Sequence, residues 1–110
     1  MLQLRKPEYQ PDDCKKIFLT EDIFALLDND DYESIRRYTW KLEQSGHCFY
    51  AVRRDKTGGK CLTFKMHREI MHTPFGYEVH HINHNTLDNR KSNLENLTAD
   101  EHRAAHFKST

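Results

Sequence analysis

The stretch VHHINHN at residues 79–85 decides how the rest of this 110-residue chain is interpreted. It places two histidines directly after an apolar residue. Two further segments follow it, DNRKSNL at residues 88–94 and HRAAH at residues 102–106. In order, the three segments supply a histidine pair, an asparagine and a second histidine pair. Side chains of these types in this order are typical of a metal site that also contains a base.

The local sequence predicts a strand, a loop, a second strand and a helix around these segments. Tyr77–His81 forms the first strand, and residues 82–93 form a polar loop whose Asn and Asp side chains favour turns. The second strand falls in SNLENL, residues 92–97. Thr98 and Glu101 have the spacing of a capping box, which predicts that a helix begins at this point.

The histidine spacing predicts a catalytic metal site. His102 and His106 are four residues apart on the predicted helix, so both imidazoles can reach one ion. His80 and His81 are neighbours in a strand and point to opposite faces, so only one of them can share that ion. The other can take a proton from water, since histidine titrates near neutral pH. Asn93 lies in the loop and is expected to close it through hydrogen bonds to backbone groups near His81.

Each pattern alone has a simpler interpretation. Two histidines four residues apart on a helix are more often solvated than bound to a metal, and a histidine pair after a strand is a weaker signal still. The conjunction of all three patterns within residues 80–106 is much less expected by chance. We therefore interpret the region as three metal ligands, one general base and one loop-closing asparagine, which together suit hydrolysis of a phosphodiester bond.

The upstream part of the chain predicts two strands and a helix. Residues 1–13 are expected to form a flexible arm. Residues 16–20 and 24–27 form two short apolar strands, and the second ends at a turn rich in aspartate. Asp30 or Asp31 then caps a helix. The apolar positions of this helix recur at helical spacing and comprise Tyr32, Ile35 and Tyr38.

A small antiparallel sheet of three strands follows from Trp40 onward. Residues 46–55 and 60–70 flank Gly58 and Gly59, which supply the positive φ that a tight turn needs. One sheet face is expected to pack on the preceding helix and the other to expose aromatic and basic side chains to DNA, although a merely solvated face is the alternative. The basic positions assigned to DNA contact, here and in the later loop, are Arg53, Arg54, Lys65, Arg90 and Lys91.

Composition restricts the range of functions. Net charge is zero, but residues 1–46 carry ten acidic and seven basic side chains, whereas residues 47–110 carry seven and ten, with all eight histidines. The C-terminal part is therefore the candidate polyanion-binding part. Three scattered cysteines without a CxxC pair argue against a disulfide framework. No apolar run approaches the roughly 18 residues of a spanning helix, so we expect a soluble, cytoplasmic protein.

The segment from HREIM at residues 67–71 to HRAAH resembles HNH endonucleases, the ββα-metal nuclease class. The resemblance is greatest to the phage- and intron-associated homing type, and it covers residues 66–106. We accordingly expect an α+β fold, in which a small N-terminal antiparallel sheet with a helix precedes a ββα-metal motif. The chain then divides into the flexible arm, a strand-rich DNA-binding region at residues 14–65 and a nuclease region at residues 66–110.

The resemblance implies a role for each site residue. His81 corresponds to the general base, His80 to the first metal ligand and Asn93 to the central asparagine. His102 corresponds to the helical ligand, and His106 to the second helical ligand of the HxxxH variants. Many homing-type members have Asp and Asn where this chain has His80 and His102. Asp and Asn suit Mg²⁺, whereas imidazoles suit Zn²⁺, Ni²⁺, Co²⁺ or Mn²⁺, so one divalent ion is expected and its identity stays open.

The expected activity is metal-dependent hydrolysis of phosphodiester bonds in double-stranded DNA. One active site cuts one DNA strand, so a monomer is expected to nick the duplex. Double-strand cleavage then needs a homodimer or two successive binding and cleavage events. A non-catalytic DNA-binding module with a structural metal is the alternative, and a nuclease for RNA is another. A small-molecule hydrolase is excluded because so short a chain has little apolar material for a pocket. No membrane partner is expected.

Overall fold

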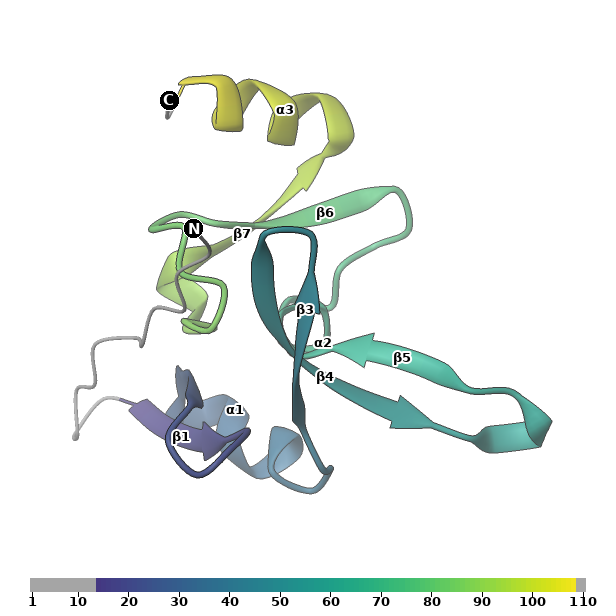
Figure 1. Cartoon of the computed structure of the whole chain (residues 1–110). Helices are drawn as coiled ribbons and strands as arrows, with labels where there is room; N and C mark the ends of the chain where they lie inside the picture. Colours follow the sequence, from purple (N-terminus) through teal and green to yellow (C-terminus); the bar gives the residue numbers. More distant parts are fainter. Residues whose placement is uncertain (1–13, 109–110) are drawn as a thin grey trace.

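The computed structural model describes the backbone of residues 14–108 and the side chains of residues 14–104. The predicted arm at residues 1–13 lies outside the described residues. The described chain combines short strands and short helices in an α+β fold, as the sequence predicts (Figure 1). None of the helices in residues 14–108 is long and apolar enough to cross a membrane.

The first two strands form a hairpin. β1 (Cys14–Phe18) pairs antiparallel with β2 (Phe24–Asp28), with Phe18 opposite Phe24. The connecting turn is held by Thr20, whose hydroxyl oxygen accepts a hydrogen bond from the backbone N–H of Ile23 at 3.0 Å. The first four residues of β2 are all buried, so this strand is covered on both faces. Both predicted strands are confirmed, and β1 begins two residues earlier than expected.

The helix α1 (Asn29–Ile35) follows β2 directly and is shorter than predicted. Its N-cap residue is Asp28, so the prediction that Asp30 or Asp31 caps the helix is wrong. Both of these aspartates lie in the first turn, where negative charge is favourable at the positive end of the helix dipole. The helix ends where the indole N–H of Trp40 donates to the carbonyl of Ile35 at 2.7 Å. This bond satisfies a terminal carbonyl and draws the indole into the core.

The predicted three-stranded sheet is confirmed. It consists of β3 (Lys41–Ser45), β4 (Cys48–Asp55) and β5 (Leu62–Lys65), paired antiparallel in the order β3-β4-β5. The turn between β4 and β5 contains the two predicted glycines at positive φ. Ala51 and Val52 point to opposite faces of β4, yet each is only 1% exposed. The centre of this strand is therefore covered on both sides, and neither face of the sheet is open along its whole length.

The C-terminal part contains the predicted strand–strand–helix unit. The helix α2 (Met66–Met71) precedes it, and β6 (Tyr77–His81) pairs antiparallel with β7 (Leu94–Thr98). The helix α3 (Ala99–Lys108) follows β7. Its capping box is present, because the Thr98 N–H donates to Glu101 Oε1 at 2.9 Å and the Glu101 N–H donates to Thr98 Oγ1 at 3.1 Å.

One hydrophobic core joins the N-terminal strands to the strand–strand–helix unit. Lys65 ends β5 and Met66 begins α2, so no linker separates the two predicted regions. The buried side chains of the core come from β2, α1, β4, α2, β6 and β7 and from the segment before β3, and they comprise Ala25, Leu27, Ile35, Trp40, Ala51, Met66, Ile70, Val79 and Leu94. Burial of this apolar surface is the main favourable contribution to folding.

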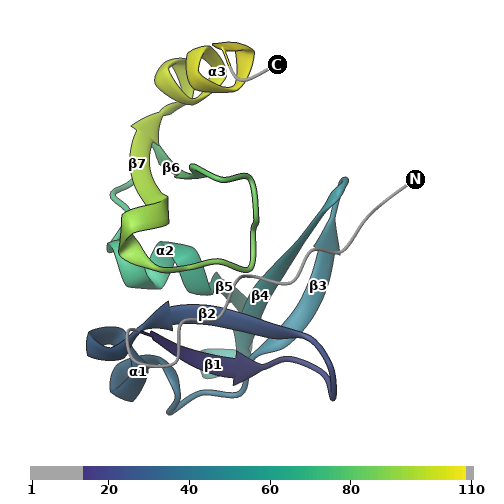
Figure 2. The same cartoon turned by 90° about the vertical axis from the view of Figure 1, so that its left-hand side faces the viewer.

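The loop between β6 and β7 also packs on the N-terminal hairpin. Figure 2 shows it descending from β6 and running along β2. The Leu26 N–H donates to the carbonyl of Leu87 at 2.9 Å, and the Asn89 N–H donates to the carbonyl of Leu26 at 2.8 Å. The outer edge of β2 is therefore paired with the loop.

Truncation of Leu27 tests the shared core. Leu27 is fully buried, so Leu27→Ala is expected to reduce the free energy of unfolding by about 2–5 kcal/mol, measured by urea denaturation. Leu62 is 48% exposed, and Leu62→Ala is the matched control, with an expected change within about 0.5 kcal/mol. Equal losses in the two variants would contradict the assignment of Leu27 to the core.

Candidate active site

The candidate site lies where β6 ends on its two histidines. His80 is 8% exposed and His81 is 6% exposed. Because neighbours in a strand point to opposite faces, the two imidazoles have different surroundings. The His80 ring packs against those of His84 and His102, with centroids 5.6 and 5.3 Å apart. This geometry is consistent with the prediction that one histidine of the pair faces a metal ion and the other faces away from it.

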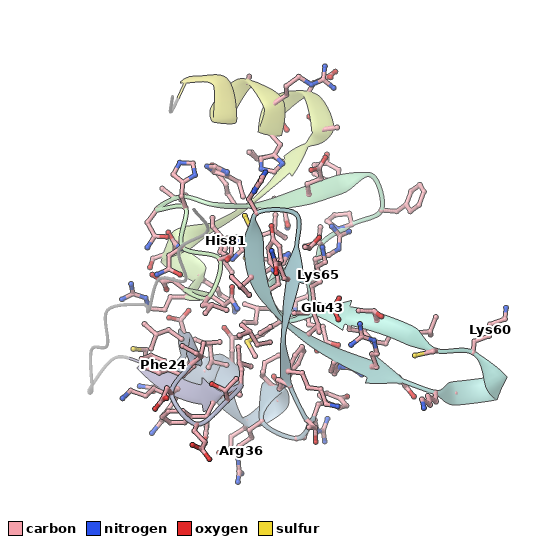
Figure 3. All side chains as sticks on the ribbon, in the orientation of Figure 1. Phe24, Arg36, Glu43, Lys60, Lys65 and His81 are labelled. Atoms are coloured by element: carbon pink, nitrogen blue, oxygen red, sulfur yellow. The ribbon has the colours of Figure 1, made fainter. Side chains whose placement is uncertain are left out.

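His81 lies in a buried, largely aromatic environment. Its ring centroid is 5.0 Å from that of His67 and 6.4 Å from that of Tyr50. Its Nε2 atom lies 2.8 Å from Asn89 Oδ1. Burial lowers the pKa of His81 below its usual value, while the contact with Asn89 acts in the opposite direction. His81 is therefore a neutral imidazole at neutral pH, which is the form a general base requires. Figure 3 shows His81 at the end of β6, beside the hairpin of β3 and β4.

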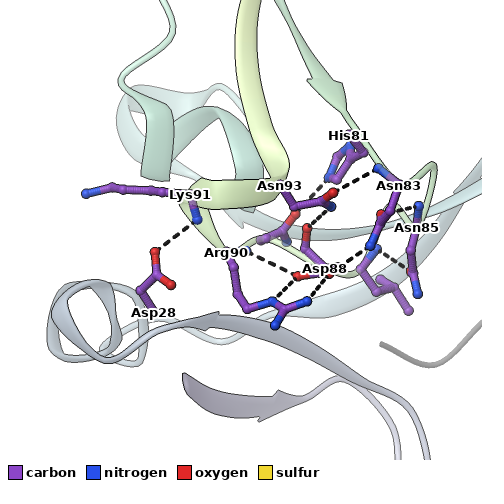
Figure 4. Close-up of polar contacts among 10 residues, drawn as sticks. Asp28, His81, Asn83, Asn85, Asp88, Arg90, Lys91 and Asn93 are labelled. Carbon is purple, nitrogen blue, oxygen red and sulfur yellow. Dashed lines mark hydrogen bonds and ion pairs between the residues drawn. The ribbon is translucent and has the colours of Figure 1, made fainter. Parts of the chain in front are cut away.

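Asn93 makes the loop-closing contacts that the sequence predicts (Figure 4). Its Oδ1 accepts a hydrogen bond from the Asn83 N–H at 2.9 Å, and its Nδ2 donates to the carbonyl of Asp88 at 2.8 Å. The backbone carbonyl of Asn93 also accepts from the Ile82 N–H at 2.8 Å. Two of these contacts join the two ends of the loop, directly after His81, and the third fixes its middle. The catalytic importance of Asn93 stays a prediction.

A buried carboxylate organises the middle of the same loop. Asp88 is 1% exposed and accepts hydrogen bonds from Arg90 Nε at 2.7 Å and Arg90 Nη2 at 2.6 Å. It also accepts one from Asn83 Nδ2 at 2.9 Å (Figure 4). The buried charge is thereby paired and hydrogen-bonded, as a stable buried carboxylate requires.

Two of the three predicted metal ligands lie side by side. Imidazoles that bind one ion tetrahedrally at about 2.1 Å have ring centroids roughly 5 Å apart, close to the 5.3 Å that separates His80 from His102. His102 Nδ1 lies 2.9 Å from Glu78 Oε1. A carboxylate only accepts, so Nδ1 carries the proton and Nε2 carries the lone pair available to a metal. This carboxylate–histidine arrangement is typical of metal-binding histidines, so the pair fits an ion.

The third predicted ligand is not tested by this geometry. The side chain of His106 lies outside the described residues, one turn beyond His102 on α3. Among the described residues, no group of three or more His, Cys, Asp or Glu side chains is arranged to hold a metal ion. An open pocket of about 370 Å³ lies beside His102 and is lined by Glu78, Ala99, His102 and Arg103. His102 is therefore accessible from solvent, whereas its neighbour His80 is buried.

Two of the five predicted DNA-contacting residues hold the fold together. Arg53 Nε donates to Glu69 Oε1 at 2.8 Å, and its guanidinium lies 3.8 Å from the ring centroid of Tyr38 and 4.1 Å from that of Phe64. Its side chain is only 12% exposed. Arg90 is held by Asp88, as described above. Tertiary contacts therefore occupy both guanidinium groups.

The other three basic residues lie nearer the surface. Arg54 pairs with Glu43 on the neighbouring strand, and its side chain is 43% exposed. Lys91 Nζ lies 3.2 Å from Asp31 Oδ1, and its side chain is 52% exposed. Lys65 Nζ lies 4.8 Å from the ring centroid of Tyr50. A DNA-contacting role for all five basic residues stays a prediction.

Four residues that surround the histidine pair were not singled out from the sequence as site residues: Glu78, Asn89, His67 and Tyr50. Glu78 precedes His80 by two residues in β6, so strand alternation could have placed it on the same face. The contacts of His67 and Tyr50 with His81 are non-local, and no spacing rule predicts them. Burial lowers the pKa of His67 to about 3 and raises that of Tyr50 to about 12.

A comparison with known families agrees with this geometry. Residues 72–104 match the family model described as HNH endonuclease. The matched segment is an HNH-type endonuclease region, which confirms the resemblance drawn from the sequence. It contains the histidine pair, Asn93 and His102, and it ends before His106. Neither the curated proteins nor the solved structures give a significant match.

The buried His67 makes a pH dependence of stability testable. The pKa of His67 is about 3 in the folded chain and 6.5 when unperturbed. Between these values the unfolded chain binds the additional proton, so the free energy of unfolding falls as the pH is lowered from 6.5 toward 3. In His67→Phe, which retains a ring, the loss of stability between pH 7 and pH 5 is expected to be smaller by up to about 2 kcal/mol.

The measurement is chemical denaturation at the two pH values. His47 is exposed, and His47→Phe is the control that should retain the pH dependence of the wild-type chain. A His67→Phe variant that loses as much stability as the wild type between pH 7 and pH 5 would show that His67 is not buried in its neutral form.

Proposed function

We propose that this chain is a metal-dependent DNA endonuclease that hydrolyses phosphodiester bonds, with His81 as the general base. The observation that carries the proposal is the arrangement at the end of β6. A buried, neutral His81 lies on one side of the strand, and the His80–His102 pair lies on the other, inside the HNH-type region. The homing-type relationship is part of the same proposal.

The proposed chemistry begins with proton transfer. The imidazole of His81 takes a proton from water, and the water oxygen attacks the phosphorus atom. Asn93 keeps the loop closed beside the base, and Glu78 fixes the ring orientation of His102. A divalent ion held by His80 and His102, with His106 as the proposed third ligand, would stabilise the charge that develops on the phosphate and the departing oxygen.

The ligand set bears on the choice of ion. Imidazole nitrogens favour Zn²⁺, Ni²⁺, Co²⁺ or Mn²⁺ over Mg²⁺, which prefers oxygen ligands. The carboxylate of Glu78 contacts Nδ1 of His102 and so orients a proposed ligand. We therefore expect turnover with Mn²⁺, Co²⁺, Ni²⁺ or Zn²⁺ to exceed that with Mg²⁺.

A second candidate function is a non-catalytic DNA-binding module in which the metal stabilises the fold. One observation favours it, because His81 is only 6% exposed and a general base must reach water. An experiment that measures cleavage and binding in the same samples separates the two functions.

Nicking of supercoiled plasmid tests the catalytic proposal. The wild-type chain is incubated with Mg²⁺, Mn²⁺, Co²⁺, Ni²⁺, Zn²⁺ or EDTA, and DNA binding is measured in parallel. His81→Ala is expected to reduce the nicking rate by about 10²–10⁴-fold with DNA affinity retained, because only proton transfer is lost. His102→Ala is expected to lower the affinity for metal. His47→Ala, at an exposed histidine, is the control that should retain activity. Retained DNA binding without cleavage by any metal would favour the non-catalytic module.

The salt dependence of DNA binding tests the proposed phosphate contacts. Each lost contact lowers the slope of log K against log salt concentration by about 0.9. Arg54→Ala, Lys65→Ala and Lys91→Ala are each expected to reduce the slope by this amount. Arg36 is also exposed but lies at the far end of the molecule from His81 (Figure 3), so Arg36→Ala is the charge-matched control. Unchanged slopes in all three variants would contradict this binding surface.

A further inference from the structure

Asn89 is an asparagine with no exposed surface, and it lies against the proposed base. We infer that Asn89 is a positioning residue: its Oδ1 accepts a hydrogen bond from Nε2–H of His81 and leaves Nδ1 as the nitrogen that takes the proton from water. The two atoms lie 2.8 Å apart. The catalytic consequence rests on the proposed function, whereas the site of the ring proton does not.

The backbone of Asn89 is held in place by the N-terminal hairpin. Its backbone N–H donates to the carbonyl of Leu26 at 2.8 Å, and Leu26 is itself fully buried in β2. The preceding residue, Asp88, is fixed by its paired hydrogen bonds with Arg90. These bonds fix the backbone on both sides of Asn89, so its side chain starts from a fixed position beside His81.

The presence of an amide at this position is difficult to explain by packing alone. Asn89 Nδ2 is buried and has no hydrogen-bond partner in the described part of the chain. An unsatisfied buried donor is unfavourable, and an apolar side chain of similar size would avoid it. The side-chain amide oxygen does make a hydrogen bond, to Nε2 of His81, and because an asparagine oxygen only accepts, this bond requires a protonated Nε2.

The surrounding rings complete the restraint on His81. His67 packs edge-on against it, with an interplanar angle of 75°, and Tyr50 packs at 53°. These contacts hold the plane of the imidazole, while Asn89 determines which nitrogen carries the proton. The division of tasks follows the general rule that the hydrogen bond at one ring nitrogen sets the role of the other.

The proposed step balances without a further reactant. Nδ1 of His81 takes one proton from water as the water oxygen forms a bond to phosphorus and the bond from phosphorus to the leaving oxygen breaks. The leaving oxygen takes a proton from solvent. The imidazolium that forms carries N–H groups at both nitrogens, and Asn89 Oδ1 stabilises it through Nε2–H. Loss of the Nδ1 proton to solvent restores the base.

Nitrogen NMR of the histidine rings tests the inference directly. In chain labelled with ¹⁵N-histidine, two-bond correlations identify the protonated ring nitrogen, and His81→Ala assigns the signal by its disappearance. We expect the wild-type proton on Nε2, in a hydrogen bond that slows its exchange with water. Asn89→Leu should lose this slowly exchanging proton, whereas Asn89→Asp, which keeps an acceptor oxygen, should retain it.

A control and a kinetic measurement accompany the spectra. Asn85 is another buried asparagine of the loop, and its Oδ1 accepts from the Leu87 N–H at 3.2 Å rather than from His81. Asn85→Ala should therefore leave the His81 signal unchanged. In plasmid nicking, Asn89→Leu should lower kcat by roughly 10- to 100-fold with little change in KM, as expected for loss of a hydrogen bond to a group that becomes charged. Asn89→Asp should retain most of the activity.

The outcomes separate this inference from the proposed function. A wild-type proton on Nδ1 would overturn the inference, and this result needs no variant to fold. An Asn89→Leu chain with wild-type kcat and an unchanged His81 signal would overturn it as well. Cleavage of DNA by the wild-type chain after metal removal and in the presence of EDTA would contradict the proposed metal-dependent function. This result would leave the inference intact if the ring proton of His81 resides on Nε2. Circular dichroism of each variant establishes that the fold is retained.

Discussion

Two backbone hydrogen bonds of Leu26 connect the N-terminal hairpin to the candidate site. They pair the outer edge of β2 with Leu87 and Asn89 in the loop between β6 and β7. Ordering a long polar loop costs conformational entropy, and few apolar contacts are available within such a loop to offset that cost. A rigid, buried strand supplies the missing restraint, because its own backbone groups would otherwise remain unpaired at a sheet edge. The hairpin is thus part of the site rather than only a neighbouring structural unit.

The alternation of side chains along β6 places two adjacent histidines in different surroundings. His80 shares its side of β6 with Glu78, whose carboxylate contacts His102 on α3. His81 faces the opposite side and packs against the rings of Tyr50 and His67. A metal ligand and a general base both require a neutral imidazole, but they require different neighbours. One peptide unit separates the two residues to which we assign these proposed roles, so the pairing of β6 with β7 fixes the distance between them.

The sequence predicts those parts of the molecule that depend on local spacing. The strand ending at His81, the capping box of Thr98 and the loop contacts of Asn93 all follow from patterns a few residues long, and the structure contains each of them. The contacts of Asn89 with His81, and of β2 with the loop, join segments that no local pattern relates. The start of α1 was misplaced because Asp28, Asp30 and Asp31 lie within four residues and each can act as an N-cap, and their position relative to β2 decides that Asp28 does so.

The five basic residues show why the number of positive side chains overstates how many of them are free to bind DNA phosphates. Each of the five predicted contacts already has a partner: a carboxylate for Arg53, Arg54, Arg90 and Lys91, and the ring of Tyr50 for Lys65. Breaking a buried pair leaves an uncompensated charge in a poorly solvated place, so Arg90 is costly to release from Asp88. An exposed pair contributes only about 0–1 kcal/mol, so Arg54 can exchange Glu43 for a phosphate at little cost. In the proposed complex, release of condensed counterions from DNA would favour that exchange, so exposure, rather than charge alone, is the property by which we rank the proposed binding residues.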